Sequence, residues 1–558
     1  MGTPLTNWFK QRGIDWKQAL AGHMETDMQM LPLFPVLEIN KITSSFVQWL
    51  FTPTTNSDKH KDLYISATRL SSQELNDNTD LAAQQTQRER FNINILPVLA
   101  NNHENSVFYQ LDLEEVAKAF ATHSLPLPPA LPDTKNTFNA ISDAMFRCKT
   151  NQLLNKPWQQ DEAKAFSLLK EAIINIEASQ PVNPKLALKA DQIVWGRCPV
   201  RMDLAGGWTD TPPHCMLNGG SAVNIAIELN GQAPIQCFAK PCPEHKIILR
   251  SIDLGSEEHL FTYNDIEQYS KVGSAFSIPR AALALSGFSP VFGNHTFDSL
   301  AEQLKNFGSG LEITTLCAVP KGSGLGTSSI LSATILGTLS EACNLGWDKI
   351  EIGKKALAIE QLLTTGGGWQ DQFGGVLEGV KFLTTQRGFD QTPLVRWISD
   401  KVLETGMLKQ RMLLYYTGIT RVAKNILSEI VRGMFLNSAK RLAILNEIEE
   451  HALYTFEELQ KGNDKNLGNI LNKSWKLNQL LDPGTNTPEI QVIIDRVAPY
   501  IDGLKLLGAG GGGFMVMLAK DAQAAATLKE DLAQFPPNPL ARFVEFSISR
   551  QGLMVTKS

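Results

Sequence analysis

The sequence predicts a mixed α/β protein with a mostly helical N-terminal region. Two observations carry this prediction. Of the 41 glycines, only Gly2, Gly13 and Gly22 precede Gly196. After Pro181, short β-branched runs punctuated by glycine replace the helical spacing of the earlier residues. Because glycine lets the backbone turn sharply and approach a ligand closely, we expect the chemistry to lie in the later part.

The composition is that of an ordinary folded protein. The chain has 558 residues, 43% hydrophobic and 20% charged, enough for several domains. A formal net charge of −5 without a long basic run argues against a nucleic-acid partner. The seven cysteines form no CxxC pair, which predicts reduced thiols rather than disulfides or a zinc site. We see neither a secretory signal nor an apolar stretch of about 18 residues, and therefore expect a cytoplasmic protein without a membrane partner.

The first 190 residues carry helical patterns with two interruptions. Residues 71–90 are rich in Gln, Asn and Asp, which indicates a solvated helix face or an exposed linker. Residues 125–132, LPLPPALP, predict a short extended connector because proline fixes φ and removes a donor. Steps of 3, 4 and 3 predict an amphipathic helix through Phe166, Leu169, Ile173 and Ile176.

The remaining residues alternate strands and helices. Strand-like runs occupy residues 193–195, 235–239, 246–251 and 311–319. A helix is expected through Ile352, Ala356, Ile359 and Leu363. From Arg411 onward a strand (MLLYYT), several helices and a late strand (FMVML) suggest a second α/β unit.

Residues 320–332, PKGSGLGTSSILS, have the features of a phosphate-binding loop. They lie between a predicted strand and an apolar helix, and their three glycines let N–H groups approach an anion. The hydroxyls at 327–329 can cap the helix start. The loop is not a Walker A motif, because Lys321 precedes the glycines. A glycine-rich turn with capping hydroxyls is the alternative interpretation.

The segment from 197 to 220 concentrates charged residues among glycines and prolines. A rigid loop of this kind can present Asp210 to sugar hydroxyls and Arg201 to a transferring phosphate. We interpret Asp203 as a structural hydrogen-bonding residue. His214 is more simply an ordinary polar loop residue than a ligand.

Two further glycine-rich segments follow. In residues 360–375, a triple glycine ends a helix and can turn the chain so that Glu360 and Asp371 converge on one pocket. The alternative is a solvated glutamate and an N-cap aspartate. Residues 507–514, LGAGGGGF, run into a strand, which argues against a dinucleotide fingerprint. This segment is expected to approach either a neighbouring loop or the substrate.

In this order, the segments PVRMDLAGGWTDTPP, PKGSGLGTSS and LGAGGGGF resemble the three motifs of the GHMP kinases. The resemblance covers about residues 190–558. It implies a two-domain kinase with an N-terminal domain over 191–405 and a ferredoxin-like C-terminal domain over 406–558. Residues 1–190 then form a helical connector, similar to the one that precedes the kinase in fused fucokinase and GDP-fucose pyrophosphorylase proteins.

The resemblance also implies roles for individual residues. Asp371 corresponds to the catalytic base, Arg201 to the arginine beside the transferring phosphate, and Glu360 and Ser328 to the Mg²⁺ ligands. The family's ATP loop corresponds to Pro320, Gly322, Ser323, Gly324, Leu325, Gly326, Thr327, Ser328 and Ser329. Substrate contacts fall on Gly207, Trp208, Thr209 and Asp210, and the C-terminal glycine motif places Gly510, Gly511 and Gly512 at the site.

The wording GGWTDTPPHCMLNGG is similar to the L-fucokinase branch of this superfamily. Galactokinases carry Glu-His where this chain has Gly207 and Trp208, and Trp208 could cover the methyl group of a 6-deoxysugar or serve packing alone. The implied reaction is transfer of the ATP γ-phosphoryl group to the C1 hydroxyl of L-fucose. A heptose-phosphate or other sugar kinase is the first alternative, and an inactive sugar and ATP sensor of the same fold is the second. The implied partners are a sugar and either a second copy of the chain or a pyrophosphorylase domain.

Overall fold

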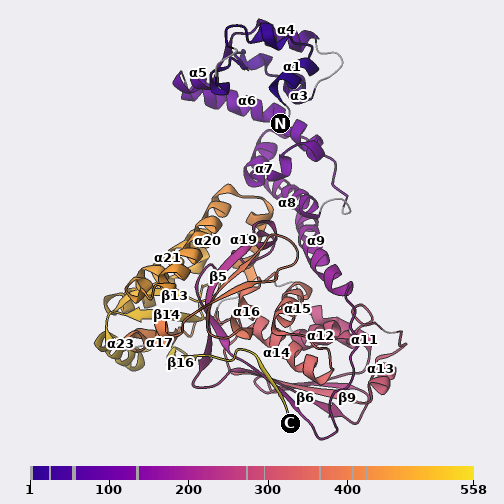
Figure 1. Ribbon diagram of the computed structural model, residues 1–558, viewed down its shortest axis with the longest axis vertical. Helices are drawn as coiled ribbons and strands as arrows, with labels where there is room; N and C mark the ends of the chain where they lie inside the picture. Colours follow the sequence, from indigo (N-terminus) through magenta and orange to yellow (C-terminus); the bar gives the residue numbers. More distant parts are fainter. Residues whose placement is uncertain are drawn as a thin grey trace. The chain divides into compact units, whose positions relative to one another are not determined.

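The computed structural model describes residues 4–23, 27–52, 58–78, 80–132, 137–271, 274–294, 296–363, 366–404, 407–420 and 424–558. The chain divides into two compact units, Met1–Ala165 and Phe166–Ser558, which are drawn in Figure 1. Each unit has its own core and is described separately.

The N-terminal unit is mostly helical, as predicted. Its helices are α1 (Leu5–Gln11), α2 (Trp16–Ala19), α3 (Ser44–Phe51), α4 (Asp58–Ser66), α5 (Ser72–Asp77), α6 (Leu81–Asn101), α7 (Leu113–Thr122) and α8 (Thr137–Leu153). Strands β1 (Phe34–Pro35) and β2 (Arg69–Leu70) form a short antiparallel ribbon. The polar segment 71–90 is largely helical and exposed, and residues 125–132 have no regular secondary structure.

One aromatic cluster fixes the first helices of this unit. Phe9, Phe46, Trp49 and Tyr64 are buried together. Arg12 lies buried beside them, and its guanidinium donates to the carbonyl oxygens of Trp49 at 3.0 Å and Leu50 at 2.9 Å. A buried cation is tolerated here because backbone carbonyls accept its hydrogen bonds. Burial lowers the pKa of Arg12 to about 10.

Two sheets form the first half of the larger unit. The six-stranded sheet has the order β17 (Met554–Lys557), β3 (Val194–Cys198), β6 (Ile235–Cys242), β9 (Gly310–Cys317), β7 (Ile247–Ser251) and β8 (Ser256–Leu260). The second has the order β11 (Leu394–Ile398), β10 (Val380–Thr385), β5 (Gly220–Leu229) and β16 (Phe546–Ile548), with β4 (Val200–Ala205) also paired to β5. The predicted strands before residue 320 are all present.

Along the chain, helices precede, separate and follow these strands. They are α9 (Gln159–Ala178), which crosses the boundary between the units, then α10 (His214–Asn218), α11 (Tyr263–Glu267), α12 (Ser277–Leu283), α13 (Leu300–Phe307), α14 (Thr327–Ala342), α15 (Lys349–Leu362), α16 (Gln370–Val376), α17 (Lys401–Glu404) and α18 (Met407–Arg411). The almost wholly buried α14 packs between strands β3 and β6 and helices α15 and α16 (Figure 1). Burial on most sides fits a sequence of small and aliphatic residues, in which buried Ser and Thr hydroxyls such as those of Thr334 and Thr338 donate to carbonyl oxygens of the same helix.

The second half has the ferredoxin-like topology that the resemblance implied. Its antiparallel sheet has the order β13 (Ile501–Leu506), β14 (Phe514–Ala519), β12 (Met412–Tyr416) and β15 (Arg542–Val544). Helices α19 (Lys424–Phe435), α20 (Ala439–Gln460), α21 (Leu467–Leu481) and α22 (Pro488–Val497) connect β12 to β13, and α23 (Ala522–Gln534) connects β14 to β15.

The last two strands lie outside the sheet of this second half. Strand β16 pairs with β5, and β17 pairs with β3, so both complete the sheets of the first half. The domain boundary between 405 and 406 stays a prediction. Residues 546–557, however, belong by their pairing to the sheets of the 191–405 half.

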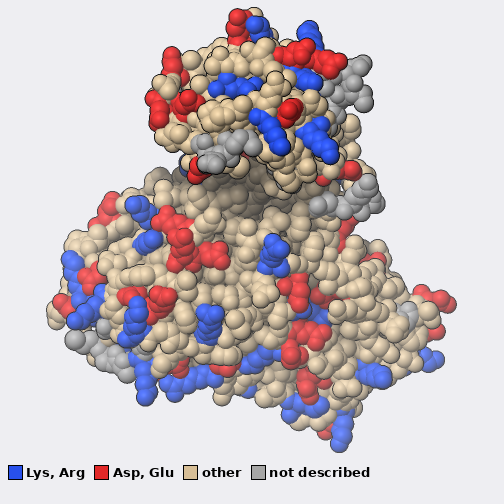
Figure 2. All heavy atoms as spheres, turned by 45° about the horizontal axis from the view of Figure 1, so that its top comes forward, with Lys and Arg blue, Asp and Glu red and all other residues tan. Residues whose placement is uncertain are grey.

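The surface carries charges of both signs. On the face of the larger unit seen in Figure 2, basic and acidic side chains are interspersed, with no broad basic patch among the described residues. The described part of the chain also contains no helix that is both long and apolar enough to cross a bilayer.

Candidate active site

The glycine loop opens directly into helix α14. Gly326 is the N-cap, in the left-handed region with φ 74°, and it makes no side-chain cap bond. The expectation that the hydroxyls at 327–329 cap the helix is therefore wrong at the N-cap position. A Cβ at Gly326 would lie 3.1 Å from Cγ of Asp371 and 3.2 Å from Cγ of Arg201. The missing side chain thus leaves the helix start, where backbone N–H groups can hold an anion, open and close to Arg201 and Asp371.

The C-terminal glycine segment packs against this loop. The N–H of Phe514 donates to the Ser323 carbonyl oxygen at 2.8 Å, and a Cβ at Gly324 would overlap the Leu507 carbonyl. Of the two expected roles, approach to a neighbouring loop is the one that the structure shows. Gly510, Gly511 and Gly512 lie against other loops: the N–H of Gly511 donates to the Thr485 carbonyl at 2.6 Å, and the Cβ positions of Gly510 and Gly512 face Thr485 and Ile419.

Arg201, in the first motif, contacts Asp371 on helix α16. From β4, its Nε donates to Oδ1 of Asp371 at 2.8 Å, and a terminal nitrogen lies 2.7 Å from the same oxygen. Its other terminal nitrogen donates to the Gly324 carbonyl at 2.6 Å and to Asp203 at 3.0 Å. Burial opposes the charge of Arg201, but Asp371 and Asp203 outweigh burial and raise its pKa.

Asp371 lies at the open end of this arrangement. Its side chain is 29% exposed, whereas that of Arg201 is 2% exposed. The N-cap of α16 is Trp369, so Asp371 is not the N-cap aspartate of the alternative interpretation. A carboxylate held from behind by a buried arginine and open in front can accept a proton from a bound hydroxyl.

Glu360 is buried on α15 and faces the start of α14. It accepts a hydrogen bond from Oγ of Ser329 at 2.7 Å. Ser328, the residue that the resemblance implied as a metal ligand, is exposed in the first turn of α14. Among the described residues no group of three or more His, Cys, Asp or Glu could hold a metal ion. Glu360 and Ser328 carry oxygen donors, the ligand type that a hard cation such as Mg²⁺ prefers.

The triple glycine runs between two carboxylates. A Cβ at Gly367 would lie 3.0 Å from Oε2 of Glu360, and one at Gly368 would overlap the carboxylate of Asp210. Glycine is required at 368 because Asp210 occupies that space.

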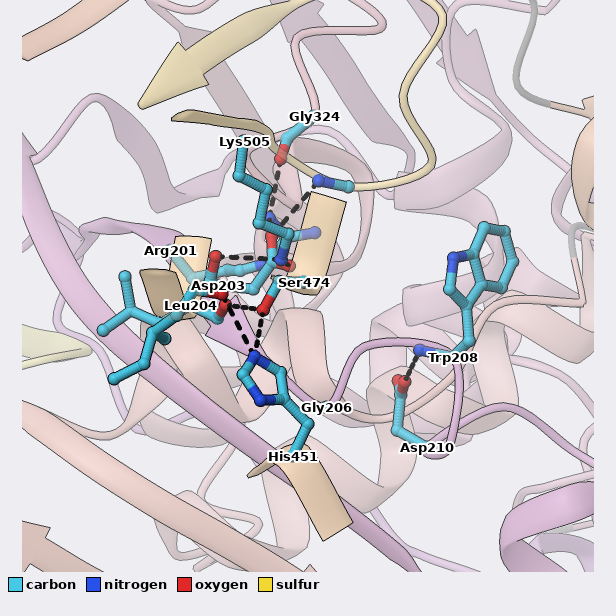
Figure 3. Close-up of polar contacts among 12 residues, drawn as sticks. Arg201, Asp203, Leu204, Gly206, Trp208, Asp210, Gly324, His451, Ser474 and Lys505 are labelled. Atoms are coloured by element: carbon cyan, nitrogen blue, oxygen red, sulfur yellow. Dashed lines mark hydrogen bonds and ion pairs between the residues drawn. The ribbon is translucent and has the colours of Figure 1, made fainter. Parts of the chain in front are cut away.

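Asp210 organises the loop of the first motif. Its oxygens accept from the N–H of Trp208 at 3.0 Å (Figure 3) and from the N–H of Gln370 at 3.0 Å. Burial, with the charge of Asp371, raises the pKa of Asp210 to about 7. The Thr209 hydroxyl forms hydrogen bonds with the carbonyl oxygens of Gly206 and Ser221 and with the N–H of Ser221.

Three other residues of this segment, Trp208, His214 and Gly207, are packed against neighbouring side chains. Trp208 lies in an apolar cluster with residues of α19, α20 and α21, which favours the packing role that the sequence left open. His214 is buried, and burial lowers its pKa to about 4, so it is neutral at pH 7. Gly207 faces the Gln370 amide, at 3.0 Å from its Cβ position to Nε2.

Sequence reasoning missed Lys505 and Gln370. Lys505 lies between two leucines of strand β13 and forms an ion pair with Asp203, and a lysine flanked by two leucines in a predicted strand was the available signal. Gln370 precedes Asp371, and its Oε1 is buried without a hydrogen-bond partner.

Comparison with known proteins bears directly on these motifs. The GHMP kinases N terminal domain matches residues 294–379, and the GHMP kinases C terminal domain matches 455–538. A Bacteroides fragilis protein named L-fucokinase/L-fucose-1-P guanylyltransferase is 45% identical over 557 residues, covering 100% of this chain and 58% of that protein. This chain belongs to the GHMP kinases.

Other relatives place the chain within this superfamily. An Arabidopsis thaliana protein named bifunctional fucokinase/GDP-fucose pyrophosphorylase is 34% identical over 60% of this chain and 31% of its own length. A Campylobacter jejuni D-glycero-alpha-D-manno-heptose 7-phosphate kinase is 29% identical over 64% of this chain and 96% of its own length. The GHMP kinase chain described here thus spans about three fifths of the first bifunctional relative and a third of the second.

Solved structures support the fold. A Lin0012 protein from Listeria innocua superposes with a TM-score of 0.51 at 13% identity, covering 65% of this chain and 99% of that protein. At this identity the likeness concerns the fold alone.

Proposed function

We propose that this chain is an ATP-dependent L-fucokinase that phosphorylates the C1 hydroxyl of L-fucose. The observation that carries the proposal is the Arg201–Asp371 pair at the mouth of the glycine loop. The choice of fucose as the sugar comes from the names of the two bifunctional relatives. Because the matched domains are kinase domains, the proposal is restricted to the kinase step.

The chain's own groups account for the transfer. The glycine loop and the open start of α14 hold phosphate oxygens through backbone N–H groups. Arg201 offsets charge that develops on the transferred phosphoryl group. Asp371 takes the proton of the attacking C1 hydroxyl, and the sugar loop around Asp210 orients the ring. Positioning and charge neutralisation are the main demands of phosphoryl transfer.

Glu360 and the hydroxyl of Ser328 would hold Mg²⁺, as the resemblance implies. The ion would neutralise phosphate charge. The hydrogen bond from Ser329 fixes one oxygen of Glu360 in direction.

A substrate panel tests the proposal. ADP release with Mg-ATP is measured with L-fucose, D-arabinose, L-galactose, D-galactose and a heptose 7-phosphate, and ³¹P and ¹H NMR locate the new phosphate. We expect L-fucose to give the highest kcat/KM and a phosphate on O1. Preference for the heptose phosphate would establish the alternative that the Campylobacter relative represents. No sugar-dependent ADP release from any sugar would favour the sensor.

The second activity in the relatives' names suggests a partner. We propose that the chain acts with a pyrophosphorylase domain that consumes its product, as the combined names of these relatives indicate. Formation of a homo-oligomer and a cytoplasmic location stay predictions.

A further inference from the structure

Lys505 is a buried cation far in sequence from the site. It lies on β13, 1% exposed, between the buried Leu504 and Leu506. Its Nζ donates to the backbone carbonyl of Asp203 at 3.1 Å and forms an ion pair with the Asp203 carboxylate. A lysine costs free energy in such a place unless an anion compensates it, and Asp203 is that anion.

Asp203 also contacts Arg201, which in turn contacts Asp371. Its other oxygen accepts from Arg201 at 3.0 Å and from the N–H of Gly508 at 3.2 Å. Arg201 in turn holds Asp371. The charges along Lys505, Asp203, Arg201 and Asp371 therefore alternate in sign, and Figure 3 shows the first three with Gly324 as one connected group.

The electrostatics of this series give Lys505 a specific effect. Burial alone would raise the pKa of Asp203, but Lys505 and Arg201 outweigh burial and lower it, so Asp203 stays ionised. Without Lys505, the buried Asp203 carboxylate would have Arg201 as its remaining cationic partner. Arg201 would then be drawn toward Asp203 and away from Asp371.

We propose that Lys505 is a positioning residue, which compensates Asp203 so that Arg201 remains directed at Asp371. The inference rests on the proposed role of Asp371 as the base. It connects the C-terminal glycine motif, which begins two residues beyond Lys505, to the group that takes the proton. Lys505 itself touches neither ATP nor sugar in this proposal.

Two variants test this with steady-state kinetics. Lys505→Met removes the charge and keeps the length of the side chain, and we expect kcat to fall about tenfold or more with KM values within about twofold of native, since geometry at the base changes and ground-state binding does not. The double variant Asp203→Asn with Lys505→Met removes both charges, leaves Asp371 as the anionic partner of Arg201, and should recover most of the lost kcat.

A matched control separates positioning from stability. Lys355 is also buried, at 3% exposure, and it pairs with Glu177 at 2.8 Å and with Glu351 at 3.9 Å rather than with a residue of the Arg201–Asp371 group. Lys355→Met should lower the melting temperature while leaving kcat near native. Retention of kcat within about twofold in Lys505→Met would overturn the proposal, as would a double variant that is no better than the single one.

A readout without turnover keeps the inference separate from the function. The Arg201 Nε–H, assigned by its loss in Arg201→Lys, is followed by ¹H–¹⁵N NMR. We expect faster exchange with solvent in Lys505→Met and near-native exchange in the double variant. Unchanged exchange would reject the positioning role even if no sugar in the panel is phosphorylated, and absence of sugar phosphorylation in the native chain would reject the proposed function alone.

Discussion

At the scale of single residues, Asp371 joins a buried network to an open site. Arg201 contacts the Asp371 carboxylate from behind through two nitrogens, and the exposed remainder faces the glycine loop. We expect replacement by asparagine, which has nearly the same size, to change chemistry more than folding at this side chain, which is 29% exposed.

Asp371→Asn tests the proposed base. We expect kcat to fall about 10²- to 10⁴-fold, the usual contribution of a general base, with little change in the melting temperature. Asp390→Asn is the control, since Asp390 is an exposed aspartate paired with Lys354 outside the site. Near-native turnover in Asp371→Asn would remove it from the mechanism.

A pair of serine variants tests the metal assignment. If Ser328 supplies the hydroxyl and Ser329 only orients Glu360, then Ser328→Ala and Glu360→Gln raise the Mg²⁺ concentration needed for half-maximal rate, and Ser329→Ala raises it less. Mg²⁺ titrations of initial rate at saturating ATP measure the order. The reverse order of the serine variants would assign the ligand oxygen to Ser329.

Asp210 gives a pH dependence of stability with a defined sign. Its pKa is raised from 3.8 to about 7, so between these pH values the folded chain binds more protons than the unfolded chain. Its contribution to the free energy of unfolding therefore falls as pH rises from about 4 to 7, by about 1.4 kcal/mol per pKa unit at most. Urea unfolding should show Asp210→Asn gaining on the native chain between pH 5 and pH 8. A difference that is independent of pH would contradict the raised pKa.

At the scale of elements, the site depends on two glycine loops in backbone contact. Gly324 and Gly508 face each other, and Gly513 lies against Ser323, so the loop at α14 and the loop before β14 fit only without side chains.

Gly324→Ala tests this contact against a glycine of matched conformation. Gly324 has φ +75° and its Cβ position overlaps the Leu507 carbonyl, whereas Gly346 has φ +73° and nothing within 4 Å of its Cβ position. Gly346→Ala should cost only the left-handed strain of about 1–2 kcal/mol. Gly324→Ala should cost more in urea unfolding and raise the KM for ATP. Equal losses would mean that the loops separate freely.

At the scale of the whole molecule, the chain's final strands complete the sheets that carry the ATP loop and Arg201. Strand β17 lies at the edge of the six-stranded sheet, and Leu553 just before it is buried against α14.

Removal of residues 552–558 should therefore destabilise the first half of the larger unit. Loss of the β3–β17 ladder and of Leu553 burial is expected to cost at least about 2 kcal/mol. Thermal unfolding of the shortened chain, compared with a chain lacking only Ser558, measures the cost. Identical melting temperatures would show that β17 contributes nothing to the sheet.

Local sequence patterns predicted much of this arrangement. The contacts between residues far apart in the sequence could not be predicted from them. The glycine loop, the strand before it and the helix through Ile352 and Ile359 follow from spacing and composition, and the family motifs indicated Arg201 and Asp371. The bond from Ser329 to Glu360 depends on how α14 and α15 face each other. The contact of Lys505 with Asp203 joins residues 302 positions apart, a distance over which a single sequence carries no pairing signal.

The return of β16 and β17 to the first sheets also orders events during synthesis. Strands β3 and β5 leave the ribosome more than 300 residues before their last partners, and the ferredoxin-like half emerges complete in between. That half can fold while translation continues, but the nucleotide-binding half must wait with two unfilled strand positions. A ribosome-stalled chain in which the residues outside the exit tunnel end near residue 545 should therefore show a protease-resistant ferredoxin-like half beside a sensitive glycine loop.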